Sequence, residues 1–196
     1  CNQINFEYCR FVGNTENRHG GAFQIRPGKT KYYTITNCEF ISNHATDSFG
    51  GALYIDESSN GDKTNINILH NTFTSNQASD GSAIYIQGSG NAEYSLINLT
   101  FRENTGCKSV FYSRSNDIII RSSTFEDSGT QGTRAIEISS TENFELDHTT
   151  IKNFNSNEDG GALKLSGPTK GNQQFLIEHC IIDNCRSSKN GGALSI

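Results

Sequence analysis

The sequence has no methionine and no tryptophan, and it has only two prolines among 196 residues. No apolar run approaches the roughly 20 residues that a membrane-spanning helix needs, so we expect no membrane insertion by this segment. Basic residues form no cluster and the formal net charge is -5, which argues against nucleic acid as a partner. Because there is no initiator methionine, we expect residues 1–196 to be a single domain cut from a longer or processed chain.

A composition that favours helices is also missing. Asparagine, serine, threonine and glycine are frequent, and their side chains or flexibility compete with the hydrogen-bonded backbone of a helix. The same residues are common in turns. The composition therefore indicates short strands joined by many turns.

A phenylalanine recurs at intervals of 24 to 33 residues, with isoleucine in its place in the last two repeats. Four other columns of apolar residues recur with it: two stand five and seven residues before it, and two follow a cluster of small residues. Ser113 is the one polar residue in the five columns. The central column consists of Phe11, Phe40, Phe73, Phe101, Phe125, Ile151 and Ile182.

The paired columns lie two residues apart, which is the period of a strand. Each repeat thus supplies three short strands, but it cannot bury its own apolar residues. If the repeats stack, each strand pairs in parallel with the same strand of the next repeat, and like residues form columns inside. The sequence predicts an all-β fold, a right-handed parallel β-helix, or solenoid, of about seven three-stranded coils.

An asparagine follows the phenylalanine by three residues in the first four repeats, and a Gly-Gly pair begins the last strand of most repeats. Asparagine tolerates left-handed backbone, so we expect it at the bend after the strand. Stacked asparagine amides can also hydrogen-bond along the rod. We read the glycines as tight corners and not as a phosphate loop, because no helix is predicted after them. The predicted structural ladder consists of Asn14, Asn43, Asn76 and Asn104.

The two motifs, F-x-x-N and G-G-A-[IL], resemble the repeats of the polymorphic outer-membrane proteins of chlamydiae and of similar surface proteins of some protists. They read "FVGN…GGAF", "FISN…GGAL", "FTSN…GSAI" and "FREN", with "GGAL" twice more near the end. The segments "CKSVFYS" and "TRAIEI" depart from the pattern because they lack the glycines. The resemblance implies a secreted or surface-displayed β-helix, with adhesion as the usual role in that family.

No convincing catalytic group emerges. Asp47, Asp80 and Asp159 precede glycine corners in separate repeats and are typical turn formers. Fold class alone does not imply an activity. We therefore expect a non-enzymatic protein, extracellular or at a cell surface, that acts in adhesion or surface display. A structural subunit of an extracellular filament or coat is the first alternative, and a carbohydrate-active β-helix enzyme is the second.

Two histidines, His148 and His179, occupy the same place in adjacent repeats. Stacked imidazoles could share a metal with Asp147 or Glu178. Neighbouring residues of a strand point to opposite faces, however, so the sequence favours a solvated or hydrogen-bonded pair. We predict no metal and no other cofactor.

Cys9 and Cys38 share one column in adjacent repeats, at a separation that suits a disulfide. Cys180 and Cys185 flank one bend, and they form the second possible pair. Buried free thiols are the alternative. Asn98 begins the one sequon for N-glycosylation.

Tyr54, Tyr85 and Tyr112 stand at outward positions in consecutive repeats, so we predict an exposed tyrosine stripe that could bind a host or self surface protein or a glycan. A structural ladder of stacked rings is the alternative. Open strand edges at the two ends would also allow end-to-end self-association. Variable segments after the third strand should gather along one edge of the rod. These segments are Arg26–Lys31, Asp56–Asn65, Gln87–Glu93 and Ser166–Gln174.

Overall fold

The structure is a computed structural model that describes residues 2–27, 30–57, 63–88, 92–106, 108–115, 117–127, 132–139, 141–167 and 174–196. These residues form 25 strands, and no helix occurs among them. In the described part of the chain, no helix is long and apolar enough to cross a membrane.

Three parallel sheets of seven strands each make up the body of the molecule. Sheet 1 consists of β1 (Gln3–Glu7), β5 (Tyr32–Thr36), β9 (Asn65–Leu69), β12 (Glu93–Ile97), β15 (Asp117–Arg121), β18 (Asn143–Asp147) and β22 (Gln174–Glu178). Sheet 2 consists of β2 (Arg10–Val12), β6 (Glu39–Ile41), β10 (Thr72–Thr74), β13 (Thr100–Arg102), β16 (Thr124–Glu126), β19 (Thr150–Lys152) and β23 (Ile181–Asp183). Sheet 3 consists of β4 (Phe23–Ile25), β8 (Leu53–Asp56), β11 (Ile84–Gln87), β14 (Ser109–Arg114), β17 (Arg134–Ser139), β21 (Leu163–Ser166) and β25 (Leu194–Ser195).

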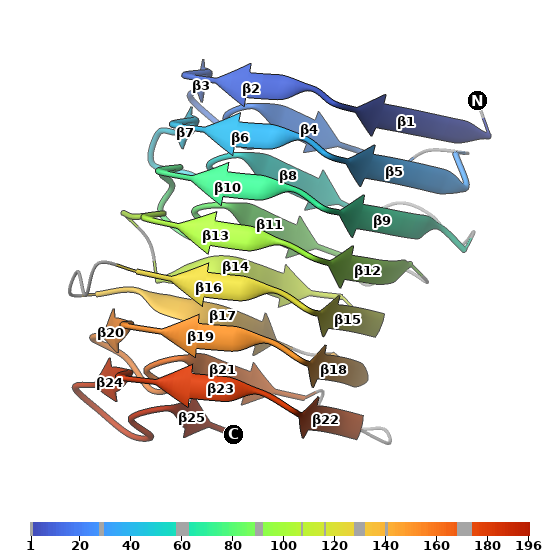
Figure 1. Cartoon of the computed structure of the whole chain (residues 1–196). Helices are drawn as coiled ribbons and strands as arrows, with labels where there is room; N and C mark the ends of the chain where they lie inside the picture. The colour runs from blue at the N-terminus through green and yellow to red at the C-terminus, as the bar shows by residue number, and fades with distance from the viewer. Residues whose placement is uncertain are drawn as a thin grey trace.

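Two small sheets pair β3 (Thr15–Glu16) with β7 (His44–Ala45), and β20 (Asn155–Ser156) with β24 (Arg186–Ser187). In Figure 1 the chain passes through sheets 1 and 2 in front, returns through sheet 3 behind, and moves down by one coil with each turn. This winding is right-handed. The predicted parallel β-helix of about seven three-stranded coils is therefore confirmed.

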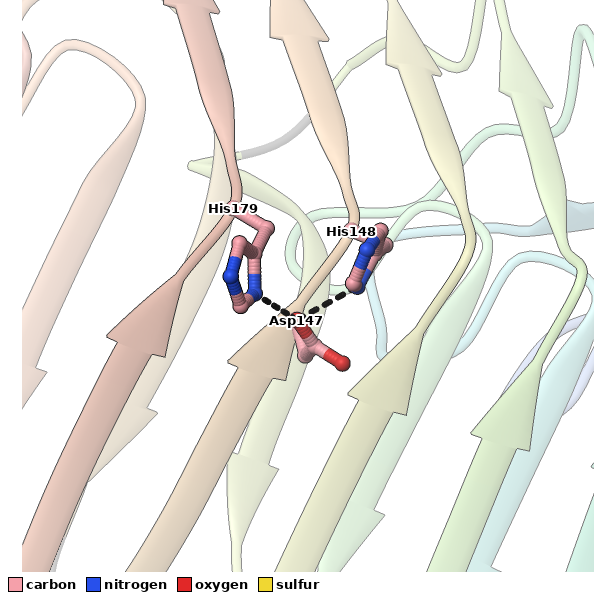
Figure 2. A group of neighbouring side chains, drawn as sticks. All are labelled: Asp147, His148 and His179. Carbon is pink, nitrogen blue, oxygen red and sulfur yellow. Dashed lines mark hydrogen bonds and ion pairs between the residues drawn. The ribbon is translucent and has the colours of Figure 1, made fainter.

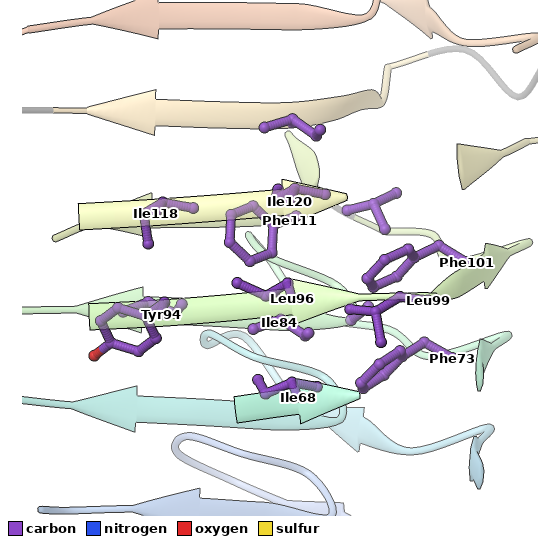
Figure 3. Close-up of a cluster of buried hydrophobic side chains, with 14 of the residues drawn as sticks. Ile68, Phe73, Ile84, Tyr94, Leu96, Leu99, Phe101, Phe111, Ile118 and Ile120 are labelled. Carbon is purple, nitrogen blue, oxygen red and sulfur yellow. The ribbon is translucent and has the colours of Figure 1, made fainter. Parts of the chain in front are cut away.

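The core is built from columns of like residues in register. Phe40 pairs with Phe73, and Phe73 pairs with Phe101, between neighbouring strands of sheet 2. The ring centroids of these pairs lie 4.8 Å and 5.0 Å apart, with the rings nearly parallel. Figure 3 shows Phe73 and Phe101 one above the other, beside inward side chains of sheets 1 and 3 such as Leu96 and Ile84. No coil could bury these side chains without its neighbours, which is why the fold depends on stacking.

The first bend of every coil contains a residue with left-handed backbone. In the bend between sheets 1 and 2, this residue has a φ between 47° and 57° in all seven coils. The residues at this first bend are Tyr8, Asn37, His70, Asn98, Ser122, His148 and His179.

The ladder asparagines do not have left-handed backbone themselves, contrary to our expectation. The residue before each one does, as in Ser42 and Ser75, and the asparagine that follows points into the rod. Asn76 donates from Nδ2 to Oδ1 of Asn104 over 3.0 Å, and Asn43 donates in the same way to Asn76. Each Oδ1 also accepts the backbone N–H of the asparagine one coil earlier. The side chains of the ladder thus satisfy backbone groups that the bends leave without a strand partner.

The two glycines of each corner have different roles. Gly50 has a φ of 69°, which suits the predicted tight corner. Gly51 lies against the next coil, where an added Cβ would be 2.2 Å from the carbonyl oxygen of Ser82. The second glycine is therefore required by the close approach of two backbones.

Candidate functional site

A groove of about 450 Å³ lies along the outer face of sheet 1, across β12, β15, β18 and β22. Its polar residues are Glu93, Ser95, Asp117, Asn143, Glu145 and Gln174, and Ile119 and Leu176 provide apolar contacts. Alternate residues of the four strands point outward, so the groove is lined by side chains that the core does not use. We call this surface the sheet 1 groove.

Each carboxylate of the sheet 1 groove already has a partner. Lys63 Nζ lies 2.6 Å from Glu93, and Arg121 Nε lies 2.5 Å from Glu145. Asn143 donates from Nδ2 to Asp117 over 2.5 Å. These contacts fix the acids in place between adjacent coils, and the groove also presents the Gln174 amide and the apolar surface of Ile119 and Leu176 to a ligand.

At the end of β18, the side chains of Asp147, His148 and His179 converge (Figure 2). Oδ1 of Asp147 lies 2.7 Å from Nδ1 of His148 and 3.0 Å from Nδ1 of His179. The two imidazole rings stack with centroids 4.6 Å apart. Hydrogen bonding from His179, and then from His148, lowers the pKa of the Asp147 carboxyl. We call these three residues the His-Asp cluster.

The strict alternation of strand residues would have kept Asp147 and His148 on opposite faces. His148 has a φ of 47°, and this left-handed bend turns its side chain back toward Asp147. The sequence predicts that the two histidines stack in adjacent coils. Their convergence with Asp147, however, depends on a left-handed backbone that the alternation of side chains along a strand does not predict.

The predicted exposed tyrosine stripe is wrong. Tyr54 is 4% exposed and Tyr85 is 9% exposed, because His19 and Phe49 from the preceding corners stack on them. Tyr85 also stacks on Tyr112 with ring centroids 4.4 Å apart. The three tyrosines form a stacked aromatic ladder on the outer side of sheet 3, which is the alternative that the sequence left open. Tyr54 and Tyr85 are buried in it, and Tyr112 is half-buried.

The predicted disulfides are not present among the described residues, where Cys9, Cys38, Cys180 and Cys185 are free thiols. Each Sγ lies within hydrogen-bonding distance of the carbonyl oxygen two residues before it, for example 3.2 Å for Cys38 and Thr36. Cys38 shares its column with Asn71, whose Oδ1 accepts the Cys38 backbone N–H. The thiols therefore fill inward positions of a bend, and burial raises the pKa of Cys38.

A buried carboxyl at the end of β8 was not predicted. Glu57 is 5% exposed and faces the hydroxyls of Tyr94 and Ser115. Burial raises its pKa to about 7, and interaction with the two hydroxyls partly offsets this shift. Gly88, one coil further on, leaves room for it, since an added Cβ there would lie 2.5 Å from the Cβ of Glu57.

The structure describes the predicted glycosylation site and parts of the variable segments. Asn98 is exposed at the first bend, and its Nδ2 lies 3.3 Å from Nδ1 of His70, so glycosylation of this accessible amide stays a prediction. The variable segments after the third strand leave sheet 3 at one edge, but residues 28–29, 58–62, 89–91 and 168–173 lie outside the described residues.

Comparison of the chain with protein-family models, with curated proteins and with solved structures finds no match. The resemblance to surface-protein repeats thus stays a prediction, and the function has to be argued from the residues themselves.

Proposed function

We propose that this chain is a non-enzymatic β-helix, extracellular or at a cell surface, that acts in adhesion or surface display. The supporting observation is that recurring and variable residues occupy different positions in the coils. The recurring residues make the columns, ladders and corners of the rod, whereas the outward positions of sheet 1 change in every coil. The first outward position of sheet 1, for example, holds Asn65, Glu93, Asp117, Asn143 and Gln174 in consecutive coils.

The sheet 1 groove is the proposed binding surface, and it takes over the role that we expected of the tyrosines. Asn143 and Gln174 offer amide donors and acceptors, and Leu176 is a 41% exposed aliphatic side chain beside them. Amides next to a small apolar surface suit the hydroxyls and C–H faces of a glycan or the rim of a surface protein. A rigid sheet also keeps these groups in place before binding, which lowers the entropic cost of association.

The experiment is a binding assay of the purified chain on intact cells and on immobilised glycans. Leu176→Ser in the groove is compared with Ile181→Ser, which removes an exposed aliphatic side chain on sheet 2 of the same coil. We expect Leu176→Ser to weaken binding and Ile181→Ser to leave it unchanged. Equal binding of the two variants, or no binding by the unaltered chain, would contradict the proposal.

The two alternative functions have direct tests. End-to-end assembly into a filament predicts concentration-dependent sedimentation and visible rods by electron microscopy. A carbohydrate-active enzyme predicts new reducing ends when the chain is incubated with acidic polysaccharides. Either result would replace adhesion as the primary role.

A further inference from the structure

We propose that the His-Asp cluster binds a divalent transition-metal ion, with one donor atom each from Asp147, His148 and His179. This inference does not rest on the proposed function. It concerns a site at the first bend of coils six and seven, next to the sheet 1 groove.

The distances within the cluster are close to those that a metal requires. Zinc binds imidazole nitrogen and carboxylate oxygen at roughly 2.0–2.2 Å, so two donors of a tetrahedral site lie about 3.3 Å apart. Oδ1 of Asp147 lies 2.7 Å and 3.0 Å from the two Nδ1 atoms, and one donor atom of each residue lies within 4.8 Å of the other two. Small rotations of the imidazoles would therefore complete three corners of a tetrahedron.

The backbone holds the three residues in this arrangement. Asp147 pairs in register with Glu178 of β22, so the residues that follow, His148 and His179, are stacked neighbours. Both histidines have left-handed backbone, with φ values of 47° and 51°. Two ligands thus come from equivalent bends of adjacent coils, and the site is formed only where those coils are stacked.

The protons can be accommodated without a change in charge. The Nδ1–H groups that face Asp147 would have to give up their protons, and a neutral imidazole can carry its proton on Nε2 instead. The carboxylate is the form of Asp147 that would ligate the ion. The imidazole rings are 62% exposed, so water or a donor from a partner can take the remaining coordination positions.

The local charge also suits a cation. The carboxylates of Glu145, Asp147 and Glu178 all interact with the guanidinium of Arg121. Two imidazoles and one carboxylate favour zinc, copper or nickel over calcium, which takes six to eight oxygen ligands. The chemical class of ligand is therefore a borderline divalent ion.

The test is a titration of the purified chain with Zn²⁺ alone, followed by calorimetry and by the ¹⁵N resonances of the histidine side chains. We expect one saturable site, with the Nδ1 signals of His148 and His179 shifting together. His179→Asn should weaken binding at least about tenfold, since loss of a supporting group alone costs roughly this much. The variant should fold normally, because Asn37 and Asn98 occupy the same bend position with φ values of 52° and 55°.

His70→Asn is the matched control, because His70 has the same bend position and its neighbour one coil on is Asn98, not a second histidine. It should leave the zinc affinity unchanged. Absence of saturable binding, or zinc binding that leaves the Nδ1 signals of His148 and His179 in place, would overturn the proposal. Binding that survives His179→Asn would assign the metal to other groups, such as the thiols, and would overturn it equally.

Discussion

Replacement of Asn76 by alanine tests the ladder that runs beside the phenylalanine column. Oδ1 of Asn76 accepts both the backbone N–H and the Nδ2–H of Asn43, at 3.0 Å each, and all these groups are buried. Alanine would leave two buried donors without this acceptor and would take the Nδ2 donor away from the carbonyl oxygen of Phe40. Each buried polar group left unsatisfied costs about 1–3 kcal/mol, so the two donors predict a loss of about 2–6 kcal/mol.

The assay is chemical denaturation of the unaltered chain and of Asn76→Ala, with the free energy of unfolding taken from the linear extrapolation. Asn14→Ala is the control, because Asn14 begins the ladder, is exposed, and has a side chain that only donates, to Asn43. That substitution leaves no described donor without its acceptor, so we expect a change within about 0.5 kcal/mol, as at ordinary surface positions. A loss for Asn76→Ala no larger than that for Asn14→Ala would refute the argument that the ladder stabilises the bends.

Two further predictions concern groups inside the rod. Glu57→Gln should stabilise the chain above pH 7 by up to about 3 kcal/mol. The pKa of Glu57 is about 7 in the folded chain and 4.5 ordinarily, so the unaltered chain loses stability as the pH rises from 4.5 to 7 and the buried carboxyl has to ionise. Glutamine carries no charge and avoids this loss. The free energies of unfolding of the unaltered chain and of Glu57→Gln, measured at pH 4 and pH 8, check this. The same difference between the two chains at both pH values would contradict the prediction. Gly51→Ala should cost at least about 1–3 kcal/mol through its clash with the Ser82 carbonyl oxygen, whereas Gly13→Asn should be tolerated, since Gly13 has a φ of 66° and open space around it. Thermal unfolding of the two variants measures the difference, and similar melting temperatures would show that the corner can relax.

The coil architecture could be predicted from the sequence because its signal is repeated seven times. Phe40, Phe73 and Phe101 each follow the same pattern of apolar residues. A single irregularity such as Ser113 does not obscure this pattern, because the other positions of the columns keep it. Stacking in register then follows from the need to bury what one coil cannot bury alone. The columns, the three sheets and the tight corner at Gly50 are all consequences of this repeated pattern.

The surface could not be predicted in the same way, because it depends on details outside the repeat. Tyr54 and Tyr85 occupy outward positions, but His19 and Phe49 come from corners of different sequence and cover them. Cys38 stands in register with Cys9, yet its Sγ lies 3.2 Å from the Thr36 carbonyl oxygen. Register tells which residues are neighbours, and the rotamers of those neighbours are set by local partners that register does not specify.

The His-Asp cluster shows how a site can arise on a regular scaffold. The first bend has left-handed backbone in every coil, and at His148 this conformation brings the side chain back to Asp147. A carboxylate followed by a histidine, with a second histidine one coil on, should therefore be sufficient. Leu69, His70 and Asn98 hold the equivalent places in coils three and four, since Leu69 pairs in register with Ile97.

Leu69→Asp combined with Asn98→His should therefore transplant the site. We expect the double variant to bind two Zn²⁺ ions per chain by calorimetry, where the unaltered chain binds one. Asn98→His alone supplies the two imidazoles without the carboxylate, and it should bind the second ion at least about tenfold more weakly. If the double variant folds and its stoichiometry stays at one, the bend geometry is not what brings the donors together. The binding at Asp147 would then depend on its particular surroundings, such as the carboxylates that flank Arg121.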